Sequence, residues 1–466
     1  MVVFAWILPA LLPVSAIATS LCSNGSELAP DVSHAGQSQK GPDSYLVKDS
    51  YIIKLKNNYS IEEHVDYIGS NVSSIGHDYY YLDIFSGYAI TTNRSVIQLI
   101  RRDPGVKWTK SNSLLYPYTP LLSPAGRKDQ MKPSSRQQLK RWRPAIQSVP
   151  LSFTLAMQSA AQKLSRFTRD RPLYWALDDA GRTVDIYVLD SGIDINHPEF
   201  EGRASNFRGW NTSPFVPLGD PRMGDLAGHG TCVASVAGGR LTGTAKHANL
   251  INVKIGDVIT TELHVISAII QVITEHKNKK RTFSRDLFAG SVINWSFGGY
   301  DTNLFGLESI IQQAKAHGIL TVTAAGNENT DAAADPICKS KDIICVGAVD
   351  QAYRKTPGSN YGEAITVSAP GHDIVCAAPS IYSNLYTAES GTSLAAAYVS
   401  GTTAQFIGYE KLRSDTGTII QRMRDNWNVG FLQGFPSRPA TPNTFNSNGF
   451  KKPNKSPDQP YVGAPA

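Results

Sequence analysis

The stretch "TVDIYVLD" at residues 183–190 decides the fold class of this chain. It is a nearly continuous run of apolar, largely β-branched residues, and the turn-forming pair Ser191 and Gly192 follows it directly. Runs like this one, alternating with helices, are typical of a parallel sheet covered on both faces. Further runs occur at residues 248–256, 291–299, 320–326 and 343–350, with amphipathic helical patterns at 262–276 and 303–318. The sequence therefore predicts an α/β fold with a doubly wound parallel sheet, whose functional groups lie beyond the carboxyl ends of the strands.

A smaller unit precedes this sheet. "SYIIKLK" alternates like a strand, Ser60 and Glu63 stand in the spacing of a capping box, and the order β-α-β-β-α-β follows to residue 117. This pattern predicts a small α+β, ferredoxin-like domain. The expected organisation is a signal peptide at 1–18, the small domain at 45–117, a linker with a dibasic pair at 118–150, the α/β domain at 151–435, and a disordered tail at 436–466.

The N-terminus indicates secretion. The apolar run "MVVFAWILPALLPVSAIATS" ends in an Ala-x-Ala cleavage signal, although a membrane anchor is the alternative for such a run. Seven Asn-x-Ser/Thr sequons fit a secreted glycoprotein. The formal net charge is +6, but the Lys and Arg residues are scattered, so no nucleic-acid partner is expected. No later segment has the apolar length of a membrane span, so we expect no membrane contact after the signal is removed.

Four polar residues follow strands or begin helices in the α/β region. Asp190 ends the first buried run, His229 lies between two glycines in "GHGT", Asn327 ends "TVTAAGN", and Ser393 opens an alanine-rich helix in "SGTSLAAAYVSG". Each has an ordinary alternative, such as a turn Asp, a packing His, a turn Asn or a helix N-cap Ser. Together they supply what hydrolysis by serine needs: a nucleophile, a base, a carboxylate that orients the base, and an oxyanion donor.

In this order, the motifs "LDSGID", "GHGT", "AAGNEN" and "SGTS" closely resemble those of the subtilisin-like serine proteases, especially the proteinase K branch. The resemblance covers residues 180–410. It implies a secreted serine endopeptidase with Ser393 as nucleophile, His229 as base, Asp190 as its orienting carboxylate and Asn327 as oxyanion donor. The rival interpretations are a non-catalytic, secreted binding protein on the same fold and a peptidase of restricted, processing-type specificity.

The resemblance also implies how substrates and the small domain bind. Residues 45–117 are similar to the inhibitory propeptide of the family, so the chain's own first domain is an expected intramolecular inhibitor. "NWSFGG" resembles the strand that pairs with an extended protein or peptide substrate. Substrate-binding residues are then Ser296, Phe297, Gly298 and Gly299, with Gly326 opposite them. We expect a monomer.

Several positions depart from the family pattern. Ala396, Ala397 and Tyr398 stand where the family has Thr-Pro-His, which predicts a shifted helix behind Ser393. Cys232 replaces a histidine close to His229, which suggests a thiol sensitive to mercurials or oxidation. Thr366 replaces an aspartate of the proteinase K-type calcium site, so no metal or other cofactor is assigned, and structural calcium elsewhere in the chain is the open alternative. A Cys338–Cys345 disulfide is expected, and the odd count of five cysteines leaves at least one thiol unpaired within the chain.

Overall fold

The computed structural model describes the two predicted units and most of the loops of the second. The described residues are 28–32, 46–69, 84–117, 144–148, 153–160, 173–177, 179–208, 224–257, 259–298, 304–381, 385–411 and 415–449. The predicted signal peptide, the dibasic pair at 140–141 and the last residues of the chain lie outside this set.

A nine-stranded sheet forms the centre of the larger unit, with strand order β17-β18-β14-β13-β12-β10-β6-β8-β7. The strands from β14 to β7 pair in parallel, and only β17 runs against its neighbour β18. Five of them are the predicted runs: β6 (Val184–Asp190), β8 (Asn249–Lys254), β10 (Gly290–Trp295), β12 (Leu320–Ala324) and β13 (Ile343–Val349). The others are β7 (Ala204–Asn206), β14 (Val367–Pro370), β17 (Asn428–Val429) and β18 (Thr444–Phe445). The predicted parallel sheet is confirmed.

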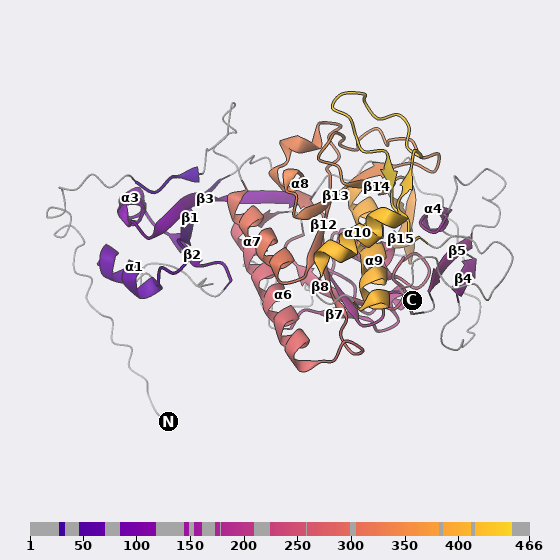
Figure 1. The fold of residues 1–466 in the computed structure, drawn as a ribbon, viewed down its shortest axis with the longest axis horizontal. Helices are drawn as coiled ribbons and strands as arrows, with labels where there is room; N and C mark the ends of the chain where they lie inside the picture. Colours follow the sequence, from indigo (N-terminus) through magenta and orange to yellow (C-terminus); the bar gives the residue numbers. More distant parts are fainter. Residues whose placement is uncertain are drawn as a thin grey trace.

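Helices cover both faces of this sheet, as Figure 1 shows. Alternate residues of β6 explain the two layers, because successive side chains of a strand point to opposite faces. Val184, Ile186 and Val188 share a core with three helices, whereas Tyr187 and Leu189 share a second core with two others. The first set is α5 (His229–Gly238), α9 (Thr392–Glu410) and α10 (Thr416–Asn426), and the second is α6 (Glu262–Thr282) and α7 (Phe305–Ala316). The fold is therefore doubly wound, as predicted.

The small unit has its own sheet and core. Its elements are β1 (Leu46–Leu55), α1 (Ile61–Ile68), β2 (Gly87–Thr91), α3 (Arg94–Arg102) and β3 (Val106–Pro117). Both β2 and β3 pair antiparallel with β1, and the capping box of Ser60 and Glu63 begins α1 as predicted. Ile53, Ile90 and Ile100 belong to a core separate from those of the larger unit. Residues 70–83, which belong to the predicted β-α-β-β-α-β unit, lie outside the described residues.

Two predicted boundaries are wrong. The expected linker 118–150 contains β4 (Pro144–Ser148), which pairs antiparallel with β5 (Leu173–Leu177). A short helix, α4 (Phe153–Met157), lies between these two strands in the sequence. The expected tail 436–466 contains β18, which pairs with β14 and carries the fully buried Phe445. Both segments belong to the larger unit because their partners, which lie far away in the sequence, satisfy their backbone groups.

The long strand β3 joins the two units. Its end pairs antiparallel with two short strands of the larger unit, β9 (Thr260–Thr261) and β11 (Phe297–Gly298). Lys110 of β3 forms an ion pair of 2.5 Å with Glu262, the first residue of α6, and both side chains are fully buried. The small unit stands beside the larger one on the side of α6 and α7 (Figure 1). Within the described residues, no helix has both the length and the apolarity needed to cross a membrane.

Candidate active site

Asp190 lies at the carboxyl end of β6, where the chain leaves the sheet. Its side chain is fully buried, and its Oδ1 accepts hydrogen bonds from the Ser191 backbone N–H and from His229 Nδ1, each at 2.7 Å. Asp190 Oδ2 has no hydrogen-bond partner among the described residues. A proton on His229 Nδ1 therefore points at the carboxylate, which leaves Nε2 as the basic nitrogen of the ring.

His229 is the first residue of α5, and glycine allows that helix to come this close to β6. A Cβ atom on Gly230 would lie 2.1 Å from the Gly192 carbonyl oxygen and 3.1 Å from Asp190 Cβ. No side chain other than hydrogen fits there. The glycine after the histidine is thus a requirement of the Asp190–His229 contact, and the ring itself is 18% exposed.

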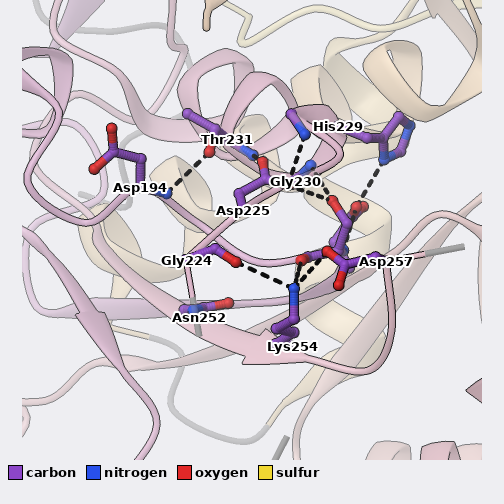
Figure 2. Close-up of polar contacts among 12 residues, drawn as sticks. Asp194, Gly224, Asp225, His229, Gly230, Thr231, Asn252, Lys254 and Asp257 are labelled. Carbon is purple, nitrogen blue, oxygen red and sulfur yellow. Dashed lines mark hydrogen bonds and ion pairs between the residues drawn. The ribbon is translucent and has the colours of Figure 1, made fainter. Parts of the chain in front are cut away.

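A second buried carboxylate, Asp225, holds the start of α5. Its Oδ1 accepts from Ser191 Oγ and from the Gly228 backbone N–H, both at 2.8 Å, and its Oδ2 accepts from the Thr231 N–H at 2.7 Å. Figure 2 shows Asp225 below Thr231 and close to Gly230, at the start of α5. The site residues expected from the sequence do not include Asp225. A carboxylate shortly before a helix start is a capping signal, and that signal could have found it.

Lys254 on β8 lies opposite Asp190 in the sheet register and is fully buried. Its ammonium group donates to the carbonyl oxygens of Ser191 at 2.6 Å and Gly224 at 3.1 Å, and to Asp257 at 2.5 Å. Figure 2 shows Lys254 reaching from β8 toward Gly224, in the segment that also contains Asp225. The lysine therefore ties the turn after Asp190 to the segment that leads into α5.

Burial has the largest single effect on the pKa of His229 and lowers it. The neighbouring carboxylates of Asp190, Asp225 and Glu389 together outweigh that effect, so the pKa of His229 lies above its ordinary value. Burial also raises the pKa of Asp225, and its hydrogen bonds from Thr231 and Ser191 oppose part of that rise. Three carboxylates thus stabilise a positive charge on the ring of His229.

Ser393 is the second residue of α9, whose N-cap is Gly391. Ser393 is therefore not the N-cap itself. Its side chain is 2% exposed, and its Oγ has no hydrogen-bond partner among the described residues. Ser393 and His229 line one cavity of about 320 Å³ without a hydrogen bond between them. Such bonds are often long in the absence of substrate and tighten when it binds.

The helix behind Ser393 runs without interruption from Thr392 to Glu410, and the Ala-Ala-Tyr departure does not break it. Tyr398 is fully buried, and its hydroxyl lies 3.0 Å from Thr154 Oγ1. All three substituted positions are therefore buried, and Tyr398 is also hydrogen-bonded.

Asn327 follows β12 and lines the same cavity. Its Oδ1 accepts from the Thr392 backbone N–H at 2.9 Å and from Thr392 Oγ1 at 3.0 Å. Thr392 therefore fixes which end of the amide is oxygen, and Asn327 Nδ2 lies 3.4 Å from where a Cβ on Gly391 would be. The structure brings Asp190, His229, Asn327 and Ser393 together, as the sequence predicts.

Three of the predicted substrate-binding residues, Ser296 to Gly298, follow β10 and include β11. Ser296 is fully buried between them, and Phe297 and Gly298 form β11, which β3 covers. Gly298 is buried, and Tyr116 of β3 lies opposite it. Gly326 adopts a φ of +99°, and a Cβ there would lie 2.3 Å from Asn360 Nδ2. Gly299 lies outside the described residues.

The cysteines correct one prediction and support another. Cys232 is bonded to Cys376 on β15 (Ile374–Ala377), so the expected reactive thiol beside His229 does not exist. The sequence does not indicate this pair, because its members are 144 positions apart in the chain. The predicted Cys338–Cys345 disulfide is present. The fifth cysteine, Cys22, lies outside the described residues. In the part of the chain that the structure describes, no group of three or more His, Cys, Asp and Glu side chains is placed to hold a metal ion.

The fold and site define a class: α/β proteins with an Asp–His pair and a helix-borne serine at the carboxyl ends of a parallel sheet. The chain belongs to the subtilase family, since the profile of the "Subtilase family" matches residues 181–423.

Individual relatives agree. The chain is 35% identical to "Subtilisin-like protease 2" of Trichophyton tonsurans over 248 residues, which are 52% of this chain and 54% of that protein. It is 27% identical to "Proteinase R" of Parengyodontium album over 389 residues, 81% of this chain and 82% of that protein. The crystal structure of "a cold adapted subtilisin-like serine proteinase" superposes with a TM-score of 0.52 at 27% identity, covering 64% of this chain and 97% of that one. The match spans about half the length of the Trichophyton relative.

Proposed function

We propose that this protein is a serine endopeptidase that cleaves peptide bonds of proteins through an acyl-enzyme. One observation carries the proposal: the 2.7 Å contact between His229 Nδ1 and Asp190 Oδ1 stands at a cavity that Ser393 and Asn327 also line. An imidazole oriented by a carboxylate, beside a serine and an amide donor, is the arrangement that acyl transfer to serine requires.

The proposed reaction has two halves. Ser393 Oγ attacks the carbonyl carbon of the scissile peptide, while His229 Nε2 takes the hydroxyl proton. The C–N bond then breaks, and His229 returns that proton to the leaving amine. In the second half, water gives a proton to His229 and attacks the ester carbonyl, and the proton returns to Ser393 Oγ as the acid leaves. Asp190 keeps the ring in the required tautomer and stabilises the imidazolium.

In each half of the proposed reaction, negative charge forms on the carbonyl oxygen, and hydrogen-bond donors must stabilise it. Ser393 lies in the first turn of α9, where the backbone N–H groups have no partner within the helix and the helix dipole favours negative charge. The second proposed donor is the amide of Asn327, whose orientation Thr392 sets. These side chains complete the proposed chemistry, and no cofactor is proposed.

We further propose that the small unit is an inhibitory propeptide, so that the protein is made as a zymogen. The pairing of β3 supports this: Tyr116 lies opposite Gly298, Pro117 opposite Phe297, and Leu114 opposite Thr261. A strand between β9 and β11 uses the main-chain groups that an extended substrate would use. Secretion is proposed on the N-terminal sequence alone, and a monomer is proposed as the active form.

A fluorophosphonate probe tests the proposal, because it reacts only with an activated serine. The matured wild-type protein is compared with Ser393→Ala. We expect one labelled serine in the wild type, mapped by mass spectrometry to Ser393, and none in the variant. Equal labelling of both would refute the enzyme and favour a binding protein on the same fold. Sequencing the N-terminus of protein collected from the medium tests both secretion and propeptide removal.

A further inference from the structure

The cavity beside Ser393 is lined by four parts of the larger unit. They are the start of α5, the hairpin of β15 and β16 (Tyr386–Glu389), the start of α9, and Asn327 after β12. None of its described lining residues belongs to β9, β10 or β11. The strands that hold β3 and the cavity are thus separate parts of the site.

A peptide that passes Ser393 must use both parts. Its acyl half pairs with β11, as β3 does, and its leaving half continues past the serine toward α5 and the hairpin. The cavity is about 320 Å³, near the lower end of the range for ligand pockets, which gives room for one side chain. The residue that follows the scissile bond is the part of a substrate that reaches this space.

The cavity carries one kind of charge. Glu389 is its only described carboxylate, and its described lining contains no lysine or arginine. Thr387 Oγ1 donates a long hydrogen bond of 3.4 Å to Glu389 Oε1, and Glu389 is half-buried. The charge of Glu389 reaches the reaction centre, since it contributes to the raised pKa of His229.

The wall that carries Glu389 is fixed in place. The Cys232–Cys376 disulfide ties β15 to α5, and the Ala377 backbone N–H donates to Ser235 Oγ at 2.9 Å. The Tyr386 hydroxyl donates to the buried Glu199 at 2.7 Å, which anchors β16 from behind. A carboxylate on a strand anchored in this way holds its position better than one on a loop.

We propose that this cavity is the subsite for the residue after the scissile bond and that it selects lysine or arginine there, with Glu389 as the specificity-determining residue. The proposal rests on the proposed function and deepens it by naming the substrate class. An ion pair in a half-buried cavity stabilises the bound substrate by up to about 1 kcal/mol, which corresponds to about 5-fold in kcat/KM.

Internally quenched peptides test this. Three peptides share one acyl half and differ only in the residue after the scissile bond: arginine, its apolar counterpart norleucine, or glutamate. The readout is the ratio of kcat/KM between arginine and norleucine, since a change common to all substrates cancels in that ratio. Wild type is expected to prefer arginine about 5-fold and to disfavour glutamate. Glu389→Gln should bring the ratio near 1, and Glu389→Lys should make glutamate the preferred residue.

Glu363→Gln is the matched control, because Glu363 is an exposed carboxylate outside the cavity lining. Its arginine-to-norleucine ratio should equal that of wild type. A wild type that cleaves all three peptides equally, or a Glu389→Gln variant that keeps the arginine preference, overturns this inference and leaves the proposed function standing. A wild type that cleaves none of the peptides and takes up no fluorophosphonate refutes the proposed function and this inference with it.

Discussion

The buried ion pair between Lys110 and Glu262 offers the sharpest test of how the small unit is held. Lys110 lies on β3, Glu262 begins α6, and neither side chain is exposed. Lys110 also donates to Ser113 Oγ at 2.7 Å, within its own strand. Lys110→Met removes the positive charge, keeps much of the aliphatic length, and leaves the Glu262 carboxylate buried without its ammonium partner.

The magnitude follows from that burial. Removing one member of a buried ion pair costs about 3–5 kcal/mol, because an uncompensated charge stays behind. Separation of the small unit would expose Glu262 to water. The substitution therefore destabilises the docked state relative to the undocked state. At about 1.4 kcal/mol per tenfold, the population of the undocked state should rise by between about 10²-fold and about 4 × 10³-fold.

Native-state hydrogen exchange of the full chain measures this population. All variants carry Ser393→Ala, which removes the proposed nucleophile and is expected to give a cleavage-dead background. The amide hydrogens of β9 and β11, which β3 covers, should exchange about 10²-fold faster or more in Lys110→Met. Amides in the centre of the main sheet should not change.

Two controls separate charge from general damage. Lys107→Met removes an exposed lysine of the same strand and should change the exchange by less than about 3-fold. Adding Glu262→Gln to Lys110→Met removes the stranded charge and should restore much of the protection. If Lys110→Met behaved like Lys107→Met, or if the second substitution added its own loss, the reasoning from the buried pair would be refuted.

Three further outcomes are expected. Asn327→Ala should lower kcat about 10²- to 10³-fold with a much smaller effect on KM, because the oxyanion forms after binding. A rise in KM as large as the fall in kcat, measured on one peptide, would argue for a structural role. Glu389→Gln removes one charge that raises the pKa of His229, and the base must be neutral to act, so the acid limb of the kcat/KM profile should move to lower pH; a limb that stays in place or moves to higher pH would contradict this. Cys376→Ser in the cleavage-dead background should lower the free energy of unfolding by about 2–4 kcal/mol in urea titrations, and a loss below about 0.5 kcal/mol would be inconsistent with a stabilising disulfide.

The sequence predicts the central strands well because buried strands of a parallel sheet are continuous apolar runs. The runs at 183–190 and 343–350 are apolar at nearly every position, and strands β6 and β13 occupy almost the same residues. The four site residues can also be predicted from the sequence, because each follows a strand or begins a helix. In a parallel α/β sheet the functional groups lie beyond the carboxyl ends of the strands, and this holds for Asp190, His229, Asn327 and Ser393.

What the sequence did not predict depends on distant partners. Residues 444–445 lie in a segment rich in Pro and Asn, yet β14 gives them a place in the main sheet. Cys232 and Cys376 pair only because α5 and β15 pack together. Asp225 and Glu389 look like surface carboxylates in the sequence, and only the packing around His229 shows that both act on its ring.

The Cys232–Cys376 disulfide has a consequence for a protein that would cut chains like itself. It closes a covalent loop between residues 144 positions apart that contains Asn327, with His229 before one end and Ser393 after the other. A backbone cut anywhere between residues 233 and 375 would leave the two fragments bonded to each other directly beside the site. A nicked molecule would therefore keep its base and its nucleophile in one covalent body, and would separate into two bands only after reduction.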